Sequence, residues 1–156
     1  MRILITGAQG QLGHALQQAL SGEDLILKDL PEFDLTQSHS ESKIVAARPS
    51  VILHVGAYTN VDGAEREPDR ALAVNVHGTT FVARAAATLN ARLIYVSTDY
   101  VFDGTQTTPY CEEDVPHPLN VYGQSKRAGE IAALTGCPTR WWFEHPGSMD
   151  MREIIW

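Results

Sequence analysis

Short apolar runs alternate with longer amphipathic stretches along most of the chain, and this alternation predicts strands that alternate with helices. The runs are rich in Ile, Leu and Val, which is typical of strands buried on both faces. The longer stretches repeat apolar residues every three to four positions, as one face of a helix requires. We predict strands at residues 3–6, 24–28, 51–55 and 93–97. We predict helices at residues 11–20, 40–47, 69–89 and 121–134.

This order predicts an α/β protein with a Rossmann-like, doubly wound parallel sheet, because strand–helix–strand units form right-handed crossovers that cover the sheet. Ligands of such sheets bind at the carboxyl ends of the strands. Polar or glycine-rich segments follow all four predicted strands, at residues 7–13, Asp29, residues 57–59 and residues 97–99. We therefore expect one site at this edge of the sheet.

Length and composition narrow the class of protein. The 156 residues fit one domain, and the net charge of −7 argues against nucleic acid or an anionic membrane as a partner. No 18-residue apolar run is present and the chain enters a strand at its start, so we expect a cytoplasmic protein without a signal peptide or membrane span. The two cysteines and six histidines show no ligand spacing, which predicts neither disulfides nor a metal site.

A glycine-rich turn at residues 6–13 follows the first predicted strand. Gly7, Gly10 and Gly13 allow a tight turn, a close approach to a pyrophosphate and close packing of the next helix, whose amino end favours phosphate. The turn predicts a dinucleotide site, and its plain alternative is a turn without a ligand. Asp29 suits the ribose hydroxyls of NAD, whereas Lys28 suits a 2′-phosphate. These residues leave NADH and NADPH both open.

Hydroxyl and acidic residues end the fourth predicted strand at positions 97–99. A hydroxyl there can bond a substrate carbonyl oxygen, so we favour Thr98 as a catalytic residue and Asp99 as its support. The plain alternative is a turn that closes the strand. Asn75, inside an apolar helix, either holds a loop or the cofactor or faces solvent. By position alone we expect cofactor contacts from Ala57, Tyr58 and Thr59.

Tyr122 and Lys126 lie four residues apart, which places them one turn apart on the same face of the last predicted helix. A nearby ammonium favours phenolate over phenol, so we expect Lys126 to lower the pKa of Tyr122 from its usual value near 10. A tyrosine of this kind can donate a proton to a carbonyl oxygen. This spacing also arises by chance on surface helices, and it gains weight from the glycine-rich turn upstream.

Taken together, these stretches resemble the extended short-chain dehydrogenase/reductase superfamily and, within it, the dTDP-4-dehydrorhamnose reductases. The Ser-Thr-Asp-Tyr-Val-Phe run at 97–102 and the Pro-Leu-Asn-Val-Tyr-Gly run at 118–123 are more specific than the glycine motif. The likeness covers residues 1–139. Its other matching stretches are residues 6–13, 57–62, 64–65 and 74–75, and Lys126 with residues 129–130.

The resemblance implies that NADPH or NADH reduces the 4-keto group of dTDP-4-dehydro-L-rhamnose to give dTDP-L-rhamnose. It implies that Tyr122 protonates the oxygen, that Lys126 also holds the nicotinamide ribose, and that Thr98 and Asp99 touch the sugar. It further implies a homodimer for the full-length protein. The positions that match the family's cofactor contacts are Gly10, Gln11, Leu12, Asp29, Asp34, Leu35 and Ala57 to Thr59.

Two residues depart from the family pattern: His54 and Gly56 stand where the family tends to have Asn and Ala. These changes put the local packing in doubt more than the chemistry. A rival of another class is a non-catalytic dinucleotide-binding subunit that regulates a partner enzyme, against which Thr98, Tyr122 and Lys126 speak. A rival of the same class is a sugar-nucleotide epimerase or dehydratase, which recycles its cofactor.

The likeness stops near residue 139, where a shifted reading frame would restore it. In the shifted frame, the third base of each codon is read together with the first two bases of the next codon. The pair Trp141-Trp142 then encodes Val in every case, and the pair Trp142-Phe143 encodes Val again. The next junctions permit Arg-Thr-Ser-Trp-Val-Tyr-Gly, which resembles the family sequence. We therefore expect an NAD(P)-binding domain at residues 1–139, without the substrate lobe, and an aberrant tail at residues 140–156.

The aberrant tail would replace a buried fifth strand, so we expect cofactor affinity to survive with very low turnover and marginal stability. The plain alternative is a divergent but genuine tail. Sequencing the coding DNA across Thr139 decides between the two, because an uninterrupted frame in independent reads would exclude the shift.

Overall fold

A computed structural model of the chain describes residues 1–111, 113–137 and 140–143, the last four as backbone only. Strands and helices alternate along the first half, as the sequence pattern predicts. The strands are β1 (Arg2–Thr6), β2 (Asp24–Lys28), β3 (Val51–His54), β4 (Arg92–Val96) and β5 (Arg140–Phe143). The α-helices are α1 (Gln11–Ala19), α2 (His39–Ala47), α3 (Val61–Arg66), α4 (Pro68–Leu72), α5 (Thr79–Leu89) and α6 (Val121–Gly136).

The strands form one parallel sheet in the order β2-β1-β3-β4-β5. The chain runs outward from β1 to β2 and then returns to place β3 on the other side of β1. The topological switch point therefore lies between β1 and β3, where ligands of doubly wound sheets bind. This confirms the predicted fold class and places all four predicted strand ends on one edge.

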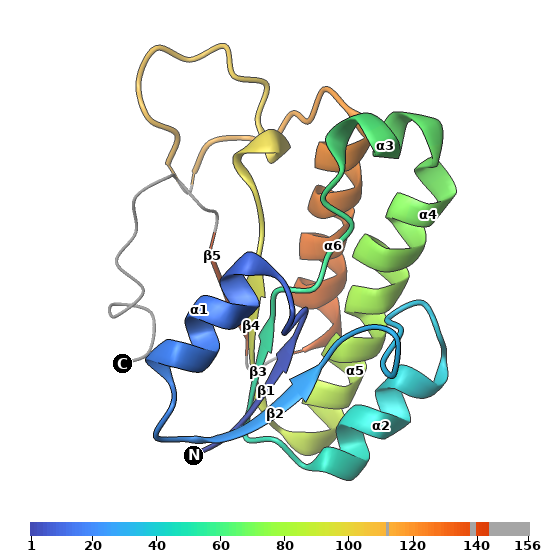
Figure 1. Ribbon diagram of the computed structural model, residues 1–156. Coiled ribbons are helices and arrows are strands. Elements are labelled where there is room, and N and C mark those ends of the chain that lie inside the picture. Colours follow the sequence, from blue (N-terminus) through green and yellow to red (C-terminus); the bar gives the residue numbers. More distant parts are fainter. Residues whose placement is uncertain (112, 138–139, 144–156) are drawn as a thin grey trace.

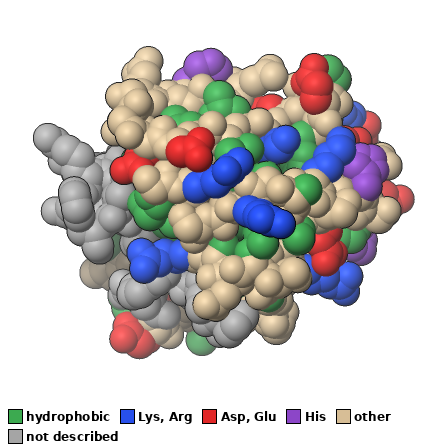
Figure 2. All heavy atoms as spheres, turned by 90° about the horizontal axis from the view of Figure 1, so that it is seen from below, with side chains coloured by type: hydrophobic (Ala, Val, Ile, Leu, Met, Phe, Trp, Pro, Cys, Tyr) green, Lys and Arg blue, Asp and Glu red, His purple; other side chains and the backbone are tan. Residues whose placement is uncertain are grey.

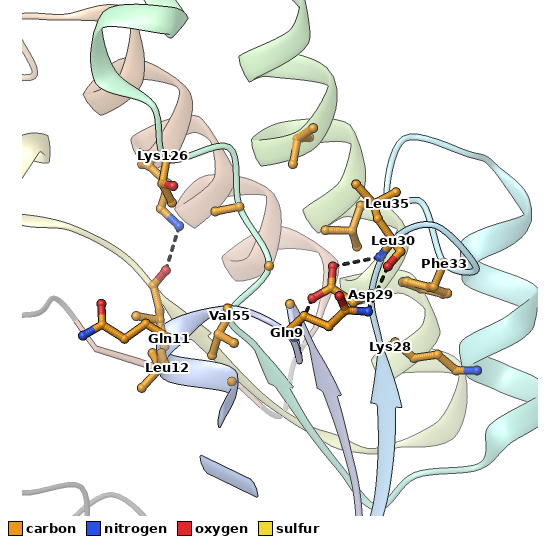
Figure 3. A pocket seen from close by; sticks show the side chains of 18 of the residues that line it. Gln9, Gln11, Leu12, Lys28, Asp29, Leu30, Phe33, Leu35, Val55 and Lys126 are labelled. Atoms are coloured by element: carbon orange, nitrogen blue, oxygen red, sulfur yellow. Dashed lines mark hydrogen bonds between the residues drawn. The ribbon is translucent and has the colours of Figure 1, made fainter. Parts of the chain in front are cut away.

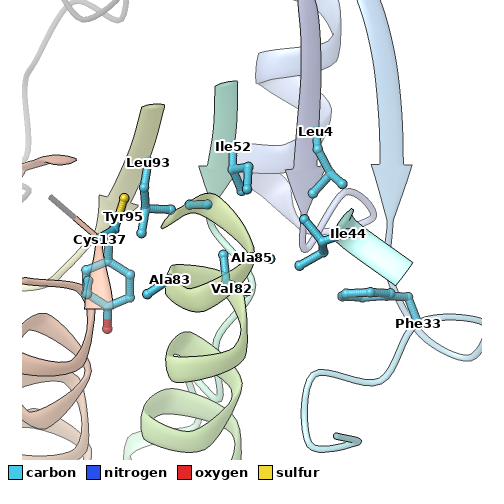
Figure 4. Close-up of a cluster of buried hydrophobic side chains, with 12 residues drawn as sticks. Leu4, Phe33, Ile44, Ile52, Val82, Ala83, Ala85, Leu93, Tyr95 and Cys137 are labelled. Atoms are coloured by element: carbon cyan, nitrogen blue, oxygen red, sulfur yellow. The ribbon is translucent and has the colours of Figure 1, made fainter. Parts of the chain in front are cut away.

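Alternate strand residues face two separate cores, because successive side chains of a strand point to opposite faces. On one face Leu4, Ile52 and Leu93 pack under α2, α5 and α6 (Figures 1 and 4). On the other face Ile3 and Ile5, among others, pack against Leu16 of α1 and Leu20 just after it. The sheet is thus covered on both sides and holds its carboxyl edge in a fixed position.

The long helix predicted at residues 69–89 is divided in the structure. α4 is followed without a break by a π-helical segment, Ala73–Gly78, and then by α5. Such π-helical turns are rare and often occur at functional sites, and this one contains Asn75. The separate helix α3 was not predicted, although Asn60 caps it by accepting a hydrogen bond from the Gly63 amide.

The fifth strand lies just beyond the predicted domain boundary at residue 139. The β5 backbone pairs in parallel with β4, from Leu93 opposite Arg140 to Val96 opposite Phe143. The sheet therefore continues into the first four residues of the predicted tail, and the domain boundary itself stays a prediction. Most of the predicted tail, residues 144–156, lies outside the described residues, so the frame-shift hypothesis stays a prediction.

The face at the amino ends of the strands lies opposite the predicted site, and its charged side chains are distributed differently from what the acidic chain as a whole would suggest. Figure 2 shows Lys and Arg side chains gathered near its centre among hydrophobic ones, with acidic side chains more widely spread. None of the helices in the described part of the chain has the length and apolar character that crossing a bilayer demands.

Candidate active site

A cleft of about 870 Å³ opens at the carboxyl edge of the sheet. Its walls come from the ends of β1 to β4, from the start of α1 and from α6 (Figure 3). Ser97 lines it as well, as expected from its place after β4, and so do Val55 and Val96 at strand ends, whose place in the sequence could have identified them, and Val74 from the π-helical segment. The predicted residues that line it are Gly7, Gly10, Gln11, Leu12, Gly13, Asp29, Asp34, Leu35, Ala57, Thr59, Tyr122 and Lys126.

Backbone crowding fixes the glycine-rich turn between β1 and α1. Gly7 has a φ of +66°, and a Cβ there would lie 2.6 Å from the Gly56 Cα. A Cβ on Gly13 would lie 2.3 Å from the Gly7 carbonyl oxygen. Gly10 is different, because its Cβ would meet the same oxygen at 3.3 Å and no other atom closely. Gly7 and Gly13 thus shape the turn, while Gly10 leaves space over it.

Asp29 braces this turn from the end of β2. One carboxylate oxygen accepts a hydrogen bond from the Gln9 amide at 2.7 Å, and the other accepts from the Leu30 amide at 2.8 Å. The Gln9 side chain donates in turn to the Leu30 carbonyl at 3.0 Å (Figure 3). The Asp29 carboxylate therefore joins two loops at the cleft, which the sequence did not show.

Asp34 lies on the same side of the cleft, but its carboxylate is already hydrogen-bonded to a neighbouring residue. Its carboxylate accepts from the Thr36 amide and hydroxyl, both at 2.8 Å. These hydrogen bonds lower the pKa of Asp34 below its usual value. The carboxylate orders the loop before α2, and Leu35 packs beside Gly56 and Gly78.

Tyr58 is not among the residues that line the cleft, unlike its neighbours Ala57 and Thr59, so its expected contact with the cofactor stays a prediction. Its hydroxyl donates to Glu67 at 3.1 Å, and the Arg70 guanidinium lies 5.7 Å from the ring centroid. The Tyr58 backbone is held by Asn75, whose amide side chain accepts from the Tyr58 N–H at 2.8 Å and donates to its carbonyl at 3.1 Å. Asn75 therefore holds a loop, one of the roles left open.

The same asparagine joins the loop to α6. Asn75 is 1% exposed, and its Nδ2 donates to the Ser125 hydroxyl at 2.8 Å. Ser125 donates in turn to the Tyr122 carbonyl at 2.7 Å. The turn that carries Tyr122 is thereby tied to the loop after β3.

His54 occupies a polar pocket that satisfies both of its ring nitrogens. Nδ1 lies 2.7 Å from the Thr6 hydroxyl, and Nε2 lies 3.0 Å from the Thr79 hydroxyl. The Thr79 hydroxyl already donates to the Asn75 carbonyl at 2.7 Å, so Nε2 must carry the ring proton and Nδ1 must accept. Burial, and then the charge of Lys126, lowers the His54 pKa to about 3. The departure at this position is therefore compatible with packing.

Tyr122 lies at the first turn of α6, which two side chains cap. Asn120 accepts from the Gly123 amide at 2.7 Å, and Glu65 accepts from the Val121 amide at 2.8 Å. A Cβ on Gly123 would lie 2.2 Å from the Tyr100 carbonyl oxygen, so only glycine lets this turn approach the segment after β4. The Tyr100 ring packs edge-on against Tyr122 with centroids 5.6 Å apart.

The structure corrects the expected pKa of Tyr122. Burial raises the pKa of this phenol above its usual value, a hydrogen bond with the Thr98 side chain works against the increase, and the charge of Asp99 adds to it. The expected lowering by Lys126 is therefore wrong in this state. Thr98 and Asp99 lie beside Tyr122 rather than in the wall of the cleft, and Thr98 also lies 3.1 Å from the Asp99 carboxylate.

Lys126 lies one turn after Tyr122 and is 3% exposed. Its ammonium donates to the Val96 carbonyl at 2.7 Å, as Figure 3 shows, and lies 4.2 Å from the Tyr95 ring centroid. Burial lowers the Lys126 pKa to about 7, although the charge of Glu130 opposes this. The ammonium is thus held at the end of β4, within the cleft wall.

Comparison with known proteins agrees with this geometry. The family described as "RmlD substrate binding domain" matches residues 1–143. The chain belongs to this family. It is 41% identical over 163 aligned residues to a dTDP-4-dehydrorhamnose reductase from Sinorhizobium fredii, an alignment that covers 99% of the chain and 55% of that protein. The chain thus spans about half the length of the curated relatives that it matches.

Solved structures of family members superpose closely. A dTDP-4-dehydrorhamnose reductase from Clostridium acetobutylicum gives a TM-score of 0.89 at 32% identity, covering 99% of this chain and 57% of that one. One from Bacillus anthracis, solved in complex with NADP, gives 0.85 at 39% identity, covering 92% and 52%. The fold and the family are therefore settled by independent comparisons.

Proposed function

We propose that this chain binds NADPH or NADH in the cleft and that its side chains serve the reduction of dTDP-4-dehydro-L-rhamnose to dTDP-L-rhamnose. One observation carries the proposal: Tyr122 and Lys126 line the same cleft as the glycine-rich turn. The names of the relatives support the reaction, and the NADP in the Bacillus anthracis relative supports the class of cofactor. A homodimer remains a prediction of the resemblance, and a cytoplasmic location remains a prediction from the sequence.

The cleft has the properties that a dinucleotide needs. Its volume of about 870 Å³ lies within the range of ligand pockets. The open space over Gly10 and the amino end of α1 suit a pyrophosphate, because backbone N–H groups and the helix dipole favour anions there. Asp29 and Lys28, at the end of β2, suit the adenosine ribose or a phosphate on it. The residues therefore fit the cofactor.

The chain's own groups then account for the proton chemistry. When bound, the reduced nicotinamide supplies the hydride that the 4-keto carbon receives. Tyr122 donates its hydroxyl proton to the keto oxygen, and its raised pKa keeps that proton on the phenol at neutral pH. Thr98, in hydrogen-bond contact with Tyr122, orients the phenol and offers a second hydroxyl to the same oxygen. The buried Lys126 ammonium holds the ribose side of the site.

The experiment compares the chain with its Tyr122→Phe variant at high protein concentration, following NADPH absorbance after addition of dTDP-4-dehydro-L-rhamnose. We expect the rate of NADPH oxidation to fall by about 10²- to 10⁴-fold, the usual contribution of a general acid. NADPH affinity should change much less than the rate, because Tyr122, which we also expect to contact the cofactor, keeps its ring in the cleft wall as phenylalanine.

The same assay separates the rivals. Equal rates in the chain and in Tyr122→Phe would contradict the proposed role of Tyr122. Conversion of the sugar without net NADPH oxidation would indicate an epimerase or dehydratase. NADPH binding without any hydride transfer would favour a regulatory subunit.

A further inference from the structure

Glu130 is a buried acid for which the proposed chemistry has no use. It is 0% exposed and lies on α6 one turn after Lys126, on the same side of the helix. A carboxylate is rarely buried completely without a partner, since its desolvation costs several kcal/mol. Its contacts therefore deserve an explanation of their own.

Both carboxylate oxygens have partners. One accepts a hydrogen bond from the Ser97 hydroxyl, at the carboxyl end of β4. The other lies 2.6 Å from an Arg127 guanidinium nitrogen, in an ion pair whose arginine is 31% exposed. Glu130 thus reaches from α6 to Ser97, a residue of the cleft wall, and its other oxygen pairs with the partly exposed Arg127.

Two groups of the cleft wall lie next to Glu130: the Ser97 hydroxyl donates a hydrogen bond to it, and Lys126 lies one turn before it on α6. The Lys126 carbonyl accepts from the Tyr95 hydroxyl at 3.3 Å, and the ammonium lies over the Tyr95 ring. A Cβ on Gly129 would lie 2.5 Å from that hydroxyl, so the glycine next to Glu130 lets the ring and α6 meet. This packing buries the Lys126 ammonium away from water, where a nearby negative charge has a large effect on its pKa.

We propose that Glu130 is a positioning residue that keeps the Lys126 ammonium charged and the Ser97 hydroxyl oriented beneath the cofactor cleft. The charge of Glu130 raises the Lys126 pKa against the effect of burial. The other titratable groups near Lys126 are Arg127 and Tyr122 on the same helix, His54 from β3 and Tyr95 from β4, and Tyr122 is an uncharged phenol because its pKa is raised. His54 is neutral above its pKa of about 3, and Tyr95 is a phenol, so Glu130 supplies the negative charge.

The test uses Glu130→Gln, which keeps an oxygen for Ser97 and removes the charge. The chain has three lysines, Lys28, Lys43 and Lys126, so Nζ signals of ¹⁵N-lysine-labelled, ligand-free protein can be assigned with Lys28→Arg and Lys43→Arg. We expect the Lys126 pKa of about 7 to fall in Glu130→Gln by about one pH unit or more, a tenfold change in proton affinity. The control Arg127→Gln removes the neighbouring positive charge instead and should raise the Lys126 pKa.

An unchanged or higher Lys126 pKa in Glu130→Gln would overturn the inference. If that variant does not fold, the double variant Glu130→Gln/Arg127→Gln is compared with Arg127→Gln alone, and the same fall is expected. The inference rests on the proposed function for the ligand of Lys126, but the titration needs no ligand. Failure of the chain to bind NADPH would contradict the proposed function and leave the titration result intact.

A second readout connects the charge to the cofactor. NADPH affinity of Glu130→Gln should be several-fold weaker than that of the unaltered chain near pH 7.5 and should approach it near pH 5, where the protonated fractions of Lys126 in the two proteins are more nearly equal. A role of Glu130 in packing alone predicts the same ratio at both pH values, and that result would contradict the proposal.

Discussion

The glycine-rich turn and the start of α6 face the same cleft, but backbone contacts define the turn whereas buried side chains define α6. In the turn, Gly7 and Gly13 leave no room for a Cβ. Around α6, hydrogen bonds that no local sequence pattern predicts are formed by Asn75, Ser125 and Glu130. A site built on sterics can be read from one short motif, whereas a site built on a buried polar network depends on partners that lie far apart in sequence, here 33 positions for Ser97 and Glu130 and 50 for Asn75 and Ser125.

The largest effect on stability is expected for Gly13→Ala. Its Cβ would lie 2.3 Å from the Gly7 carbonyl oxygen and 2.8 Å from the Ala8 backbone, and neither can move without opening the turn. We expect a loss of about 3 kcal/mol or more in the free energy of unfolding, measured by urea denaturation, at the upper end of overpacking effects.

Gly22→Ala is the matched control, because a Cβ at Gly22 meets no atom within 4 Å. This variant should be neutral or slightly stabilised, since alanine restricts the unfolded chain. Equal losses for the two variants would show that the turn is not defined by steric contact.

Asn75→Ala should weaken the other wall of the cleft. The change leaves the Tyr58 N–H and carbonyl and the Ser125 hydroxyl without their buried partner. We expect a loss of about 2–3 kcal/mol in unfolding free energy, because each buried polar group left unpaired costs about 1–3 kcal/mol.

Ser125→Ala removes one of the same hydrogen bonds and should cost about 1 kcal/mol. If it proved as costly as Asn75→Ala, the bonds from Asn75 to the Tyr58 backbone would contribute little, and the proposed link between loop and helix would be wrong.

The pH dependence of stability should report His54. Its pKa is about 3 in the folded state and near 6.5 in the unfolded chain, so its contribution is complete above pH 6.5. As the pH falls below 6.5, the unfolded state binds a proton that the folded state does not bind, so the free energy of unfolding decreases. Between pH 6.5 and 5 we expect a loss of about 2 kcal/mol, at about 1.4 kcal/mol per pH unit.

Urea denaturation of His54→Asn across the same pH range checks this slope. In the variant the slope of unfolding free energy against pH should decrease by the equivalent of about one bound proton, and His77→Asn, which replaces an exposed histidine, is the surface control. An unaltered slope in His54→Asn would mean that the buried ring is already protonated in the folded protein.

The smallest effect on stability is expected for Gly10→Ala. A Cβ there meets the Gly7 carbonyl oxygen at 3.3 Å, so a small adjustment suffices and the loss should stay below about 1 kcal/mol. Because the methyl group occupies the space proposed for the pyrophosphate, NADPH affinity in a fluorescence titration should still fall markedly. Intact affinity would place the cofactor elsewhere.

Sequence patterns predicted the first four strands, the sheet type and the glycine-rich turn because each depends on local periodicity or on glycine geometry. The division of residues 69–89 and helix α3 were missed, since tertiary contacts of Asn75 and capping by Asn60 decide them. The spacing of Tyr122 and Lys126 predicted a common cleft. It could not predict the raised Tyr122 pKa, which follows from burial by residues distant in sequence.

A titration of NADPH into ¹⁵N-lysine-labelled protein tests the central claim that both walls of the cleft serve one ligand. We expect the Lys126 Nζ signal to shift and saturate while the Lys43 signal, from α2, stays in place. In Gly10→Glu, where a carboxylate occupies the phosphate position on the opposite wall, the Lys126 shift should disappear. A Lys126 signal that ignores NADPH, or that responds equally in Gly10→Glu, would contradict the account.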